Sequence, residues 1–196
     1  MGYSQAQKAE SRQRVLETAS RQIREHGIEA LGVADCMRSA GLTHGAFYGH
    51  FTSREALIVE ALEYAVAHSE KRIAALSTGA GGKHSKADGS LQAIAESFLS
   101  ERHRDNPGSG CALCALAGEA RYAGPEVKER LTHYVRKFAS QIAGTLSGHS
   151  ESVALGIVAT IVGAVTIARA VDDDELAKSI LSASLALVMA QNSVDQ

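Results

Sequence analysis

Residues 33–51 read VADCMRSAGLTHGAFYGHF, and this stretch decides the fold. Residues 33–40 can form a short helix, and the Gly-Leu pair that follows can make a tight turn. Thr43 can then cap a second short helix over residues 44–51. Helix, glycine turn and helix in this order predict a helix-turn-helix, whose second helix fits the major groove of duplex DNA.

The residue types around the second helix suit contact with DNA. Thr43, beside the amides of a helix N-terminus, can bind a phosphate through its hydroxyl group and the helix dipole. Tyr48 and His50 have polar tips that can reach phosphates, and Arg54 can hold a strand by its charge. Small residues let the helix backbone approach base edges, and these are Gly45, Ala46 and Gly49. The segment therefore predicts contacts to both backbone and bases.

The motif AGLTHGAFYGHF at residues 40–51, followed by Arg54, Glu55 and Leu57, resembles the third helix of the TetR family of bacterial transcriptional regulators and its junction with the fourth. The resemblance covers about residues 10–64. It implies an all-helical homodimer that binds double-stranded operator DNA. Each subunit would have a three-helix DNA-binding domain and a larger helical domain that binds a small ligand.

The resemblance also assigns domains and roles by position. It implies a helix-turn-helix DNA-binding domain at residues 1–54 and a helical effector-binding and dimerisation domain at residues 55–196, with about nine helices in all. The residues expected to contact the DNA backbone are Thr43, Tyr48, His50 and Arg54, and those expected to face bases are His44, Gly45 and Ala46.

The alternative for this segment is a structural helix-turn-helix without a DNA function. Phe47 and Phe51 lie four residues apart on one helical face, so we expect both in the core. Tyr48 lies off that stripe, which favours an outward role. Cys36, on the preceding helix, is expected to be a small core hydrophobe. The outward tyrosine favours the DNA-binding interpretation.

The composition of the 196-residue chain is that of a soluble globular protein, with 45% apolar and 21% charged residues. Its net charge of -2 argues against a wholly basic nucleic-acid coat protein. The charge is uneven, because residues 1–54 carry seven basic and five acidic side chains, whereas residues 55–196 carry 13 and 17. This asymmetry favours an anion-binding N-terminal module on a more acidic body.

Apolar periodicity and the scarcity of proline predict helices throughout, with neither strands nor internal repeats. Residues 77–90 contain four glycines and lack periodicity, so we expect a loop there. Residues 153–171 are apolar but interrupted by glycine, threonine and arginine, which favours a buried helix over a membrane span. Helices are expected at residues 9–26, 33–40, 44–51, 54–76, 91–104, 111–122, 127–146, 150–171 and 173–190.

Three cysteines without a recognisable secretion signal predict reduced thiols and a cytoplasmic protein. Cys111 and Cys114 lie at i and i+3 on one predicted helical face. They can form an oxidant or electrophile sensor, because a helix N-terminus favours the thiolate, or they can be small core residues. A zinc site would need two further ligands at a recognisable spacing, so we expect no metal and no cofactor.

The larger domain is expected to hold the effector pocket and the dimer interface. The candidate effector contacts combine aromatic side chains with one carboxylate, which suits a mostly apolar molecule with a polar handle, although each can also be ordinary core. They are Phe98, Cys111, Cys114, Leu116, Glu119, Tyr122, Tyr134 and Phe138. The last two helices carry many small residues, which lets helices pack closely in a four-helix dimer interface or within one chain.

These patterns predict a homodimeric repressor that a small-molecule effector releases from its operator, with no membrane partner. We expect no enzymatic activity, because the spacing assembles no nucleophile, base and orienting acid. The alternative is a thiol-based repressor that oxidants or electrophiles switch through Cys111.

Overall fold

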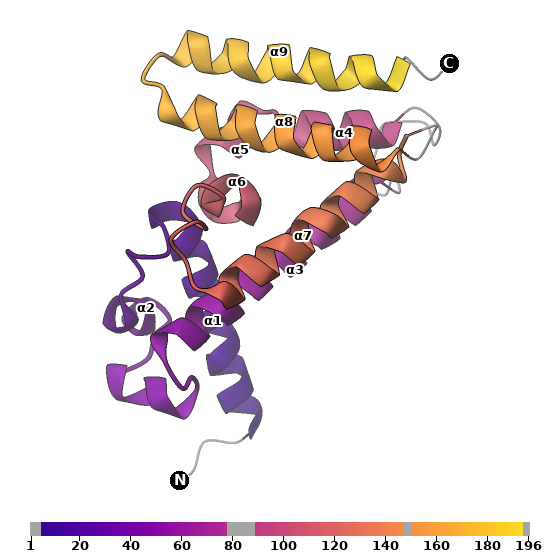
Figure 1. Cartoon of the computed structure of the whole chain (residues 1–196). Coiled ribbons are helices and arrows are strands. Elements are labelled where there is room, and N and C mark those ends of the chain that lie inside the picture. Colours follow the sequence, from indigo (N-terminus) through magenta and orange to yellow (C-terminus); the bar gives the residue numbers. More distant parts are fainter. Residues whose placement is uncertain (1–4, 78–88, 147–149, 194–196) are drawn as a thin grey trace. The chain divides into compact units, whose positions relative to one another are not determined.

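The computed structural model describes residues 5–77, 89–146 and 150–193, and this part of the chain consists of helices and their connections (Figure 1). It contains nine α-helices, two 3-10 helices and no strand. The predicted all-α fold is confirmed. The loop expected at residues 77–90 lies, for residues 78–88, outside the described residues.

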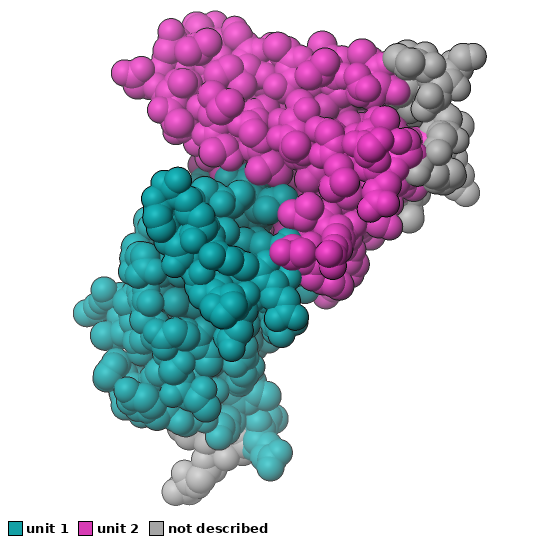
Figure 2. All heavy atoms as spheres, in the orientation of Figure 1, with its two compact units in different colours: residues 1–67, 107–131 teal, residues 68–106, 132–196 magenta. Residues whose placement is uncertain are grey.

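The described residues form two compact units (Figure 2). Unit 1 comprises residues 1–67 and 107–131, and unit 2 comprises residues 68–106 and 132–196. The helices are α1 (Gln5–His26), α2 (Val33–Ser39), η1 (His44–Gly49), α3 (Arg54–Ser77), α4 (Gly89–Phe98), α5 (Glu101–Asp105), η2 (Pro107–Ser109), α6 (Ala112–Leu116), α7 (Pro125–Ala143), α8 (Glu151–Ala170) and α9 (Asp174–Ser193). Helices α3 and α7 contribute to both units. The expected domain boundary after residue 54 falls at the start of α3, and the division of roles between domains stays a prediction.

Helix α1 is the central element of unit 1. Its apolar stripe places Val15, Ala19 and Ile23 in the core with no exposed surface. The helix ends at Gly27, whose φ of +91° suits glycine and whose amide donates to the carbonyl oxygen of Ile23 at 3.0 Å. The expected C-terminus of the first helix is confirmed.

The helix-turn-helix is formed by α2, a turn at Gly41 and η1. Gly41 has a φ of +75°, as the tight turn requires. Phe47 and Phe51 are buried and their rings stack with centroids 5.8 Å apart, so the expected core positions are confirmed. Cys36 is fully buried on α2, and burial raises the pKa of its thiol to about 11. The thiol is therefore a core group.

The second helix of this motif is a 3-10 helix, η1, rather than the short α-helix expected at residues 44–51. The amide of Ala46 donates to the carbonyl oxygen of Thr43 at 3.1 Å, and that of His50 donates to Phe47 at 2.8 Å. Two glycines in six residues weaken α-helical propensity, and 3-10 turns are common in such short elements. Thr43 occupies the N-cap with an extended backbone, but its side chain makes no capping hydrogen bond.

Unit 2 is built around helices α8 and α9, which lie side by side in Figure 1, with α4 packed on both. The hydroxyl of Ser150 caps α8 by accepting from the amide of Val153 at 3.4 Å. Helix α8 is long and apolar enough to cross a membrane, with a mean hydropathy of 2.0, and a core helix of a soluble protein passes the same test. It is the single helix with this property among the described residues.

Two expected helices differ from the structure in length. The helix expected at residues 91–104 is interrupted at Leu99 and Ser100, because Ser100 adopts an extended backbone and its hydroxyl accepts from the amide of His103 at 3.2 Å. The helix expected at residues 111–122 contains only the five residues of α6, followed by turns through Gly118. At the first break the Ser100 hydroxyl competes with the helical hydrogen bonds. After α6 the amides of Glu119 and Ala120 both donate to the carbonyl oxygen of Leu116, which makes a turn.

Candidate nucleic-acid interface

The outer face of η1 carries most of the residues expected to contact DNA. Tyr48 is 74% exposed, as its position off the apolar stripe predicts. Thr43, His44 and Gly45 are also exposed, and Ala46 is half-buried. Phe47 packs edge-on against the Tyr48 ring with centroids 5.2 Å apart, so the core residue supports the outward one. The structure thus exposes four of these five residues to solvent.

Two glycines leave this surface open. A Cβ at Gly45 or Gly49 would meet no atom within 4 Å, so packing within the chain does not require glycine at either position. Glycine at such a position is typical of a backbone that approaches another molecule closely.

His50 lies at the C-cap of η1 in a positive environment. Burial lowers the pKa of its imidazole, and the charges of Lys8 and Arg12 on α1 lower it further. His50 is therefore neutral at neutral pH and can approach a phosphate as a hydrogen-bond donor rather than as a cation.

Lys8 and Arg12 were not among the residues that the sequence motif indicates. They lie four residues apart on α1, so they share a helical face, and that spacing of two basic residues is the signal that could have found them. Arg12 is fixed by an ion pair with Glu60 on α3 and lies 4.9 Å from the centroid of the Phe51 ring. Lys8 is exposed, and its charge acts on His50 at the end of η1.

Arg54 has a different setting from the other expected DNA contacts. Its Nε donates to the carbonyl oxygen of Leu31 at 3.0 Å, and its Nη2 donates to those of Ile28 at 2.9 Å and Glu29 at 3.0 Å. The guanidinium thus holds the loop between α1 and α2, and a phosphate contact by Arg54 stays a prediction.

The expected effector contacts fall into two groups. Phe98, Tyr134 and Phe138 meet in the core of unit 2, where the Phe98 and Phe138 rings are 5.3 Å apart and the Tyr134 and Phe138 rings are 6.1 Å apart. Arg72 lies 4.7 Å from the centroid of the Phe98 ring, which adds a cation to the aromatic cluster. The remaining residues belong to unit 1, namely Cys111, Cys114, Leu116, Glu119 and Tyr122.

The residues of the unit 1 group have different surroundings. Cys111 is 1% exposed at the N-cap of α6, and Cys114 is also buried, as the core interpretation of both thiols predicts. Tyr122 is 74% exposed and lies under the guanidinium of Arg121. The carboxylate of Glu119 accepts from the amide of Ile28 at 2.8 Å. These four side chains therefore have different environments: two buried thiols, one exposed ring and one carboxylate bound to a backbone amide.

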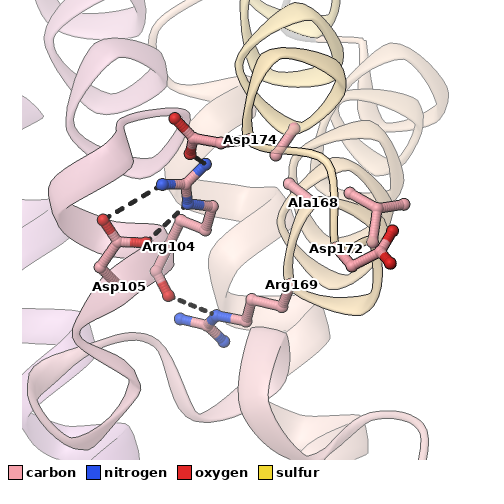
Figure 3. Close-up of a pocket in the computed structure, with 8 residues that line it drawn as sticks. Arg104, Asp105, Ala168, Arg169, Asp172 and Asp174 are labelled. Carbon is pink, nitrogen blue, oxygen red and sulfur yellow. Dashed lines mark hydrogen bonds and ion pairs between the residues drawn. The ribbon is translucent and has the colours of Figure 1, made fainter.

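A pocket in unit 2 lies beside the turn between α8 and α9 (Figure 3). Its volume is about 330 Å³, and charged side chains dominate its lining. The guanidinium of Arg104 pairs with Asp105 at 2.6 Å and Asp174 at 2.9 Å, and Arg169 donates to the carbonyl oxygen of Arg104 at 2.9 Å. These pairings stabilise the turn and use the charges that an ionic ligand would need. Within the described ranges, no three metal-ligating side chains come together.

Sequence comparison identifies related proteins for the N-terminal part of the chain. Residues 15–61 match the family described as bacterial regulatory proteins, tetR family. The chain is 31% identical over 77 residues, 39% of its length, to the uncharacterized HTH-type transcriptional regulator YerO of Bacillus subtilis. The chain spans less than two thirds of the curated relatives it matches, 27% of YerO and 62% of the next.

Two solved structures share the fold over nearly the whole chain. One is SCO4454, a TetR-family transcriptional regulator from Streptomyces coelicolor, with a TM-score of 0.67, 25% identity and coverage of 94% of this chain and 97% of that chain. The other is the reduced form of NemR from E. coli, with a TM-score of 0.74, 20% identity and coverage of 91% and 95%.

An exposed helix held on a small aromatic core, in a wholly helical chain, defines a helix-turn-helix protein. The family model and the solved structure of SCO4454 both name the TetR family. Residues 15–61 match the DNA-binding region of the TetR family of bacterial regulatory proteins, and the fold of the described residues is that of a solved TetR-family regulator.

Proposed function

We propose that this chain is a DNA-binding transcriptional regulator, and that it represses transcription until a small-molecule effector releases it from its operator. The observation that carries the proposal is the exposed face of η1, where Tyr48 projects from a surface fixed by buried Phe47 and Phe51. Thr43, His44 and Gly45, close to it in sequence, are also exposed, so η1 is accessible to a duplex. Regulation of this kind needs no catalytic machinery, and a cytoplasmic location fits its three thiols.

Phosphates would be held by Thr43, Tyr48, His50 and Lys8, and the small residues of η1 would face base edges. The carbonyl contacts of Arg54 favour a supporting role for that residue over direct contact. Phosphate contacts set the register of a protein on DNA, and base contacts supply specificity. This division assigns sequence discrimination to His44, Gly45 and Ala46.

Dimerisation through α8 and α9 supports the same proposal. Large hydrophobic side chains are exposed on these two helices: Leu155 (41%), Ile167 (54%), Leu176 (48%) and Leu187 (56%). Burying them against a second copy would form a four-helix interface. The dimer would present two η1 helices to half-sites about one duplex turn, roughly 34 Å, apart.

The effector would be a mostly apolar molecule that binds near the aromatic cluster of Phe98, Tyr134 and Phe138. These rings are fully buried, so a ligand would have to bind a state in which they are repacked. An effector can release DNA only if it binds that state more tightly than the DNA-bound state.

The geometry does not favour the thiol-based alternative through Cys111. A reactive thiol needs access to its oxidant, and Cys111 is almost wholly buried. The structural likeness to reduced NemR, at 20% identity, concerns the fold alone.

A pair of tyrosine variants tests the proposed DNA interface. We expect Tyr48→Ala to weaken binding to a duplex from upstream of the gene by about tenfold, because a phosphate hydrogen bond from the tyrosine hydroxyl is worth roughly 1.4 kcal/mol. Tyr122→Ala is the matched control, since Tyr122 is equally exposed in the same unit but lies away from η1 in sequence. Equal affinities of the two variants, measured by fluorescence anisotropy, would contradict the proposal.

A further inference from the structure

The C-terminal end of α1 is fastened to the segment of residues 107–119 inside unit 1. Arg24 Nη1 donates to the carbonyl oxygen of Gly110 at 3.0 Å. The Glu25 carboxylate lies over Gly108, so a Cβ there would require the Glu25 side chain to move. The Arg24 hydrogen bond to Gly110 and the contact of Glu25 with Gly108 therefore hold this segment against α1.

Glu119, at the end of this segment, contacts the residues that directly follow α1. Its Oε2 accepts from the amide of Ile28 at 2.8 Å, and its carboxylate lies over Gly27, where a Cβ would be 2.6 Å from Oε1. Gly27 is thus favoured by its positive φ, and a Cβ at this position would also displace the Glu119 carboxylate. Ile28 is the first residue after that turn, so Glu119 fixes the start of the loop between α1 and α2.

The same loop is held from its other side by Arg54. The carbonyl oxygen of Ile28 accepts from the guanidinium of Arg54 at 2.9 Å, and those of Glu29 and Leu31 accept at 3.0 Å each. Arg54 is the first residue of α3 and follows η1 closely in sequence. Ile28 is therefore bound by Glu119 through its amide and by Arg54 through its carbonyl group.

We propose that Glu119 is a positioning residue of the DNA-binding head, the part of unit 1 at residues 5–54. Glu119 fixes Ile28 and with it the loop between α1 and α2, whose carbonyl groups bind Arg54. Because Arg54 follows η1 closely in sequence, this loop sets the position of η1 relative to α1. The inference rests on the proposed DNA-binding function. It replaces the effector contact expected for Glu119 with a role in operator affinity.

The direction of the change in DNA affinity distinguishes a positioning role of Glu119 from a direct effect of its charge. Removing a carboxylate near the head lowers the negative charge that a phosphate backbone meets, which by Coulomb's law would strengthen DNA binding. Loss of positioning has the opposite effect, because the amide of Ile28 is left without this acceptor and the loop is no longer fixed. Weaker binding after removal of a negative charge is thus the signature of positioning.

Three variants of the full chain test the proposal against a labelled duplex from upstream of the gene. We expect Glu119→Ala to bind about tenfold more weakly than wild type, and Glu119→Gln, whose amide oxygen can still accept, to stay within about twofold. Glu129→Ala removes an exposed carboxylate from the same unit and is expected to bind at least as tightly as wild type. Circular dichroism confirms that each variant is folded at the binding temperature.

Wild-type-like or tighter binding by folded Glu119→Ala would overturn the proposal, and so would a loss of thermal stability with unchanged affinity. If Glu119→Ala fails to fold, Glu119→Asp keeps the charge, shortens the reach and is expected to lose affinity as well. Amide hydrogen exchange at residues 28–31 gives a readout without DNA, expected to be faster in Glu119→Ala than in Glu119→Gln. Failure of wild type to bind DNA would contradict the proposed function alone, and unchanged exchange would contradict the inference.

Discussion

Arg54 shows how the partners of a single residue determine its role. Its position after the helix-turn-helix is that of a phosphate contact, yet three of its hydrogen bonds go to carbonyl oxygens of the loop between α1 and α2. A residue that bound one phosphate would contribute about 0.9 to the slope of log affinity against log salt concentration.

We expect Arg54→Met to weaken DNA binding without changing that slope, because the variant disturbs the loop rather than an ionic contact. Lys8→Met serves as the comparison, since Lys8 is exposed beside η1, and its removal is expected to lower the slope by about one. Titrations at several salt concentrations measure both. If the slope falls for Arg54→Met as much as for Lys8→Met, Arg54 contacts a phosphate and the prediction is wrong.

The sequence could predict those parts of the site that depend on neighbours in the chain, but not those that depend on distant partners. Outward Tyr48 and inward Phe47 follow from local helical spacing, and both expectations are confirmed. The bond between Glu119 and Ile28 joins residues 91 positions apart, and no local pattern contains that information. The sequence therefore predicts the face of the recognition element but not the contacts that hold it.

At the scale of elements, the sequence predicts the existence of helices better than their ends. Gly27 ends α1 where expected, because glycine is favoured at a left-handed C-terminal position. The break between α4 and α5 was not predicted, because Ser100 stands between two segments, residues 91–98 and 101–105, that are each helical. A capping hydroxyl competes with the helix there, and only the packing of the neighbouring helices decides which prevails.

Helix α5 contains a buried histidine that makes stability depend on pH. His103 is 3% exposed, and its Nδ1 lies 2.7 Å from the carbonyl oxygen of Phe98. Burial lowers the pKa of its imidazole to about 4, the hydrogen bond to Phe98 raises it in part, and Arg72 and Arg169 lower it further. The unfolded chain binds this proton more readily than the folded chain. The contribution of neutral His103 to the free energy of unfolding is therefore fully present above pH 6.5 and is lost as the pH drops toward 4.

We expect His103 to account for a loss of about 3 kcal/mol between these limits, from roughly 1.4 kcal/mol per unit of pKa. Urea unfolding at a series of pH values measures the loss. His103→Gln should reduce it, whereas His133→Gln, at an exposed position on α7, should not. The same pH dependence in wild type and His103→Gln would show that other groups cause it.

At the scale of the whole molecule, the proposed function requires two copies of this chain. Residues 1–54 carry seven basic and five acidic side chains, a small excess for holding a polyanion. A dimer doubles that excess and links two heads to one duplex. Non-specific DNA binding should still be weak and should fall quickly with salt.

We expect Leu187→Glu to convert the protein to monomers, because it would place a charge in the proposed interface of α8 and α9. Sedimentation equilibrium measures the mass, and the same sample should lose most of its operator affinity. His133→Glu introduces the same charge on exposed α7 and should leave the dimer intact. A monomeric wild-type chain, or a dimeric Leu187→Glu, would refute the interface.

The measurement that tests the central claim most directly is a footprint of the purified protein on the DNA upstream of its gene. The proposed dimer with two exposed η1 helices predicts two protected half-sites whose centres lie about one duplex turn, roughly 34 Å, apart. Tyr48→Ala should lose both half-sites together. Protection that is absent, or uniform along the duplex and unchanged in Tyr48→Ala, would contradict the account.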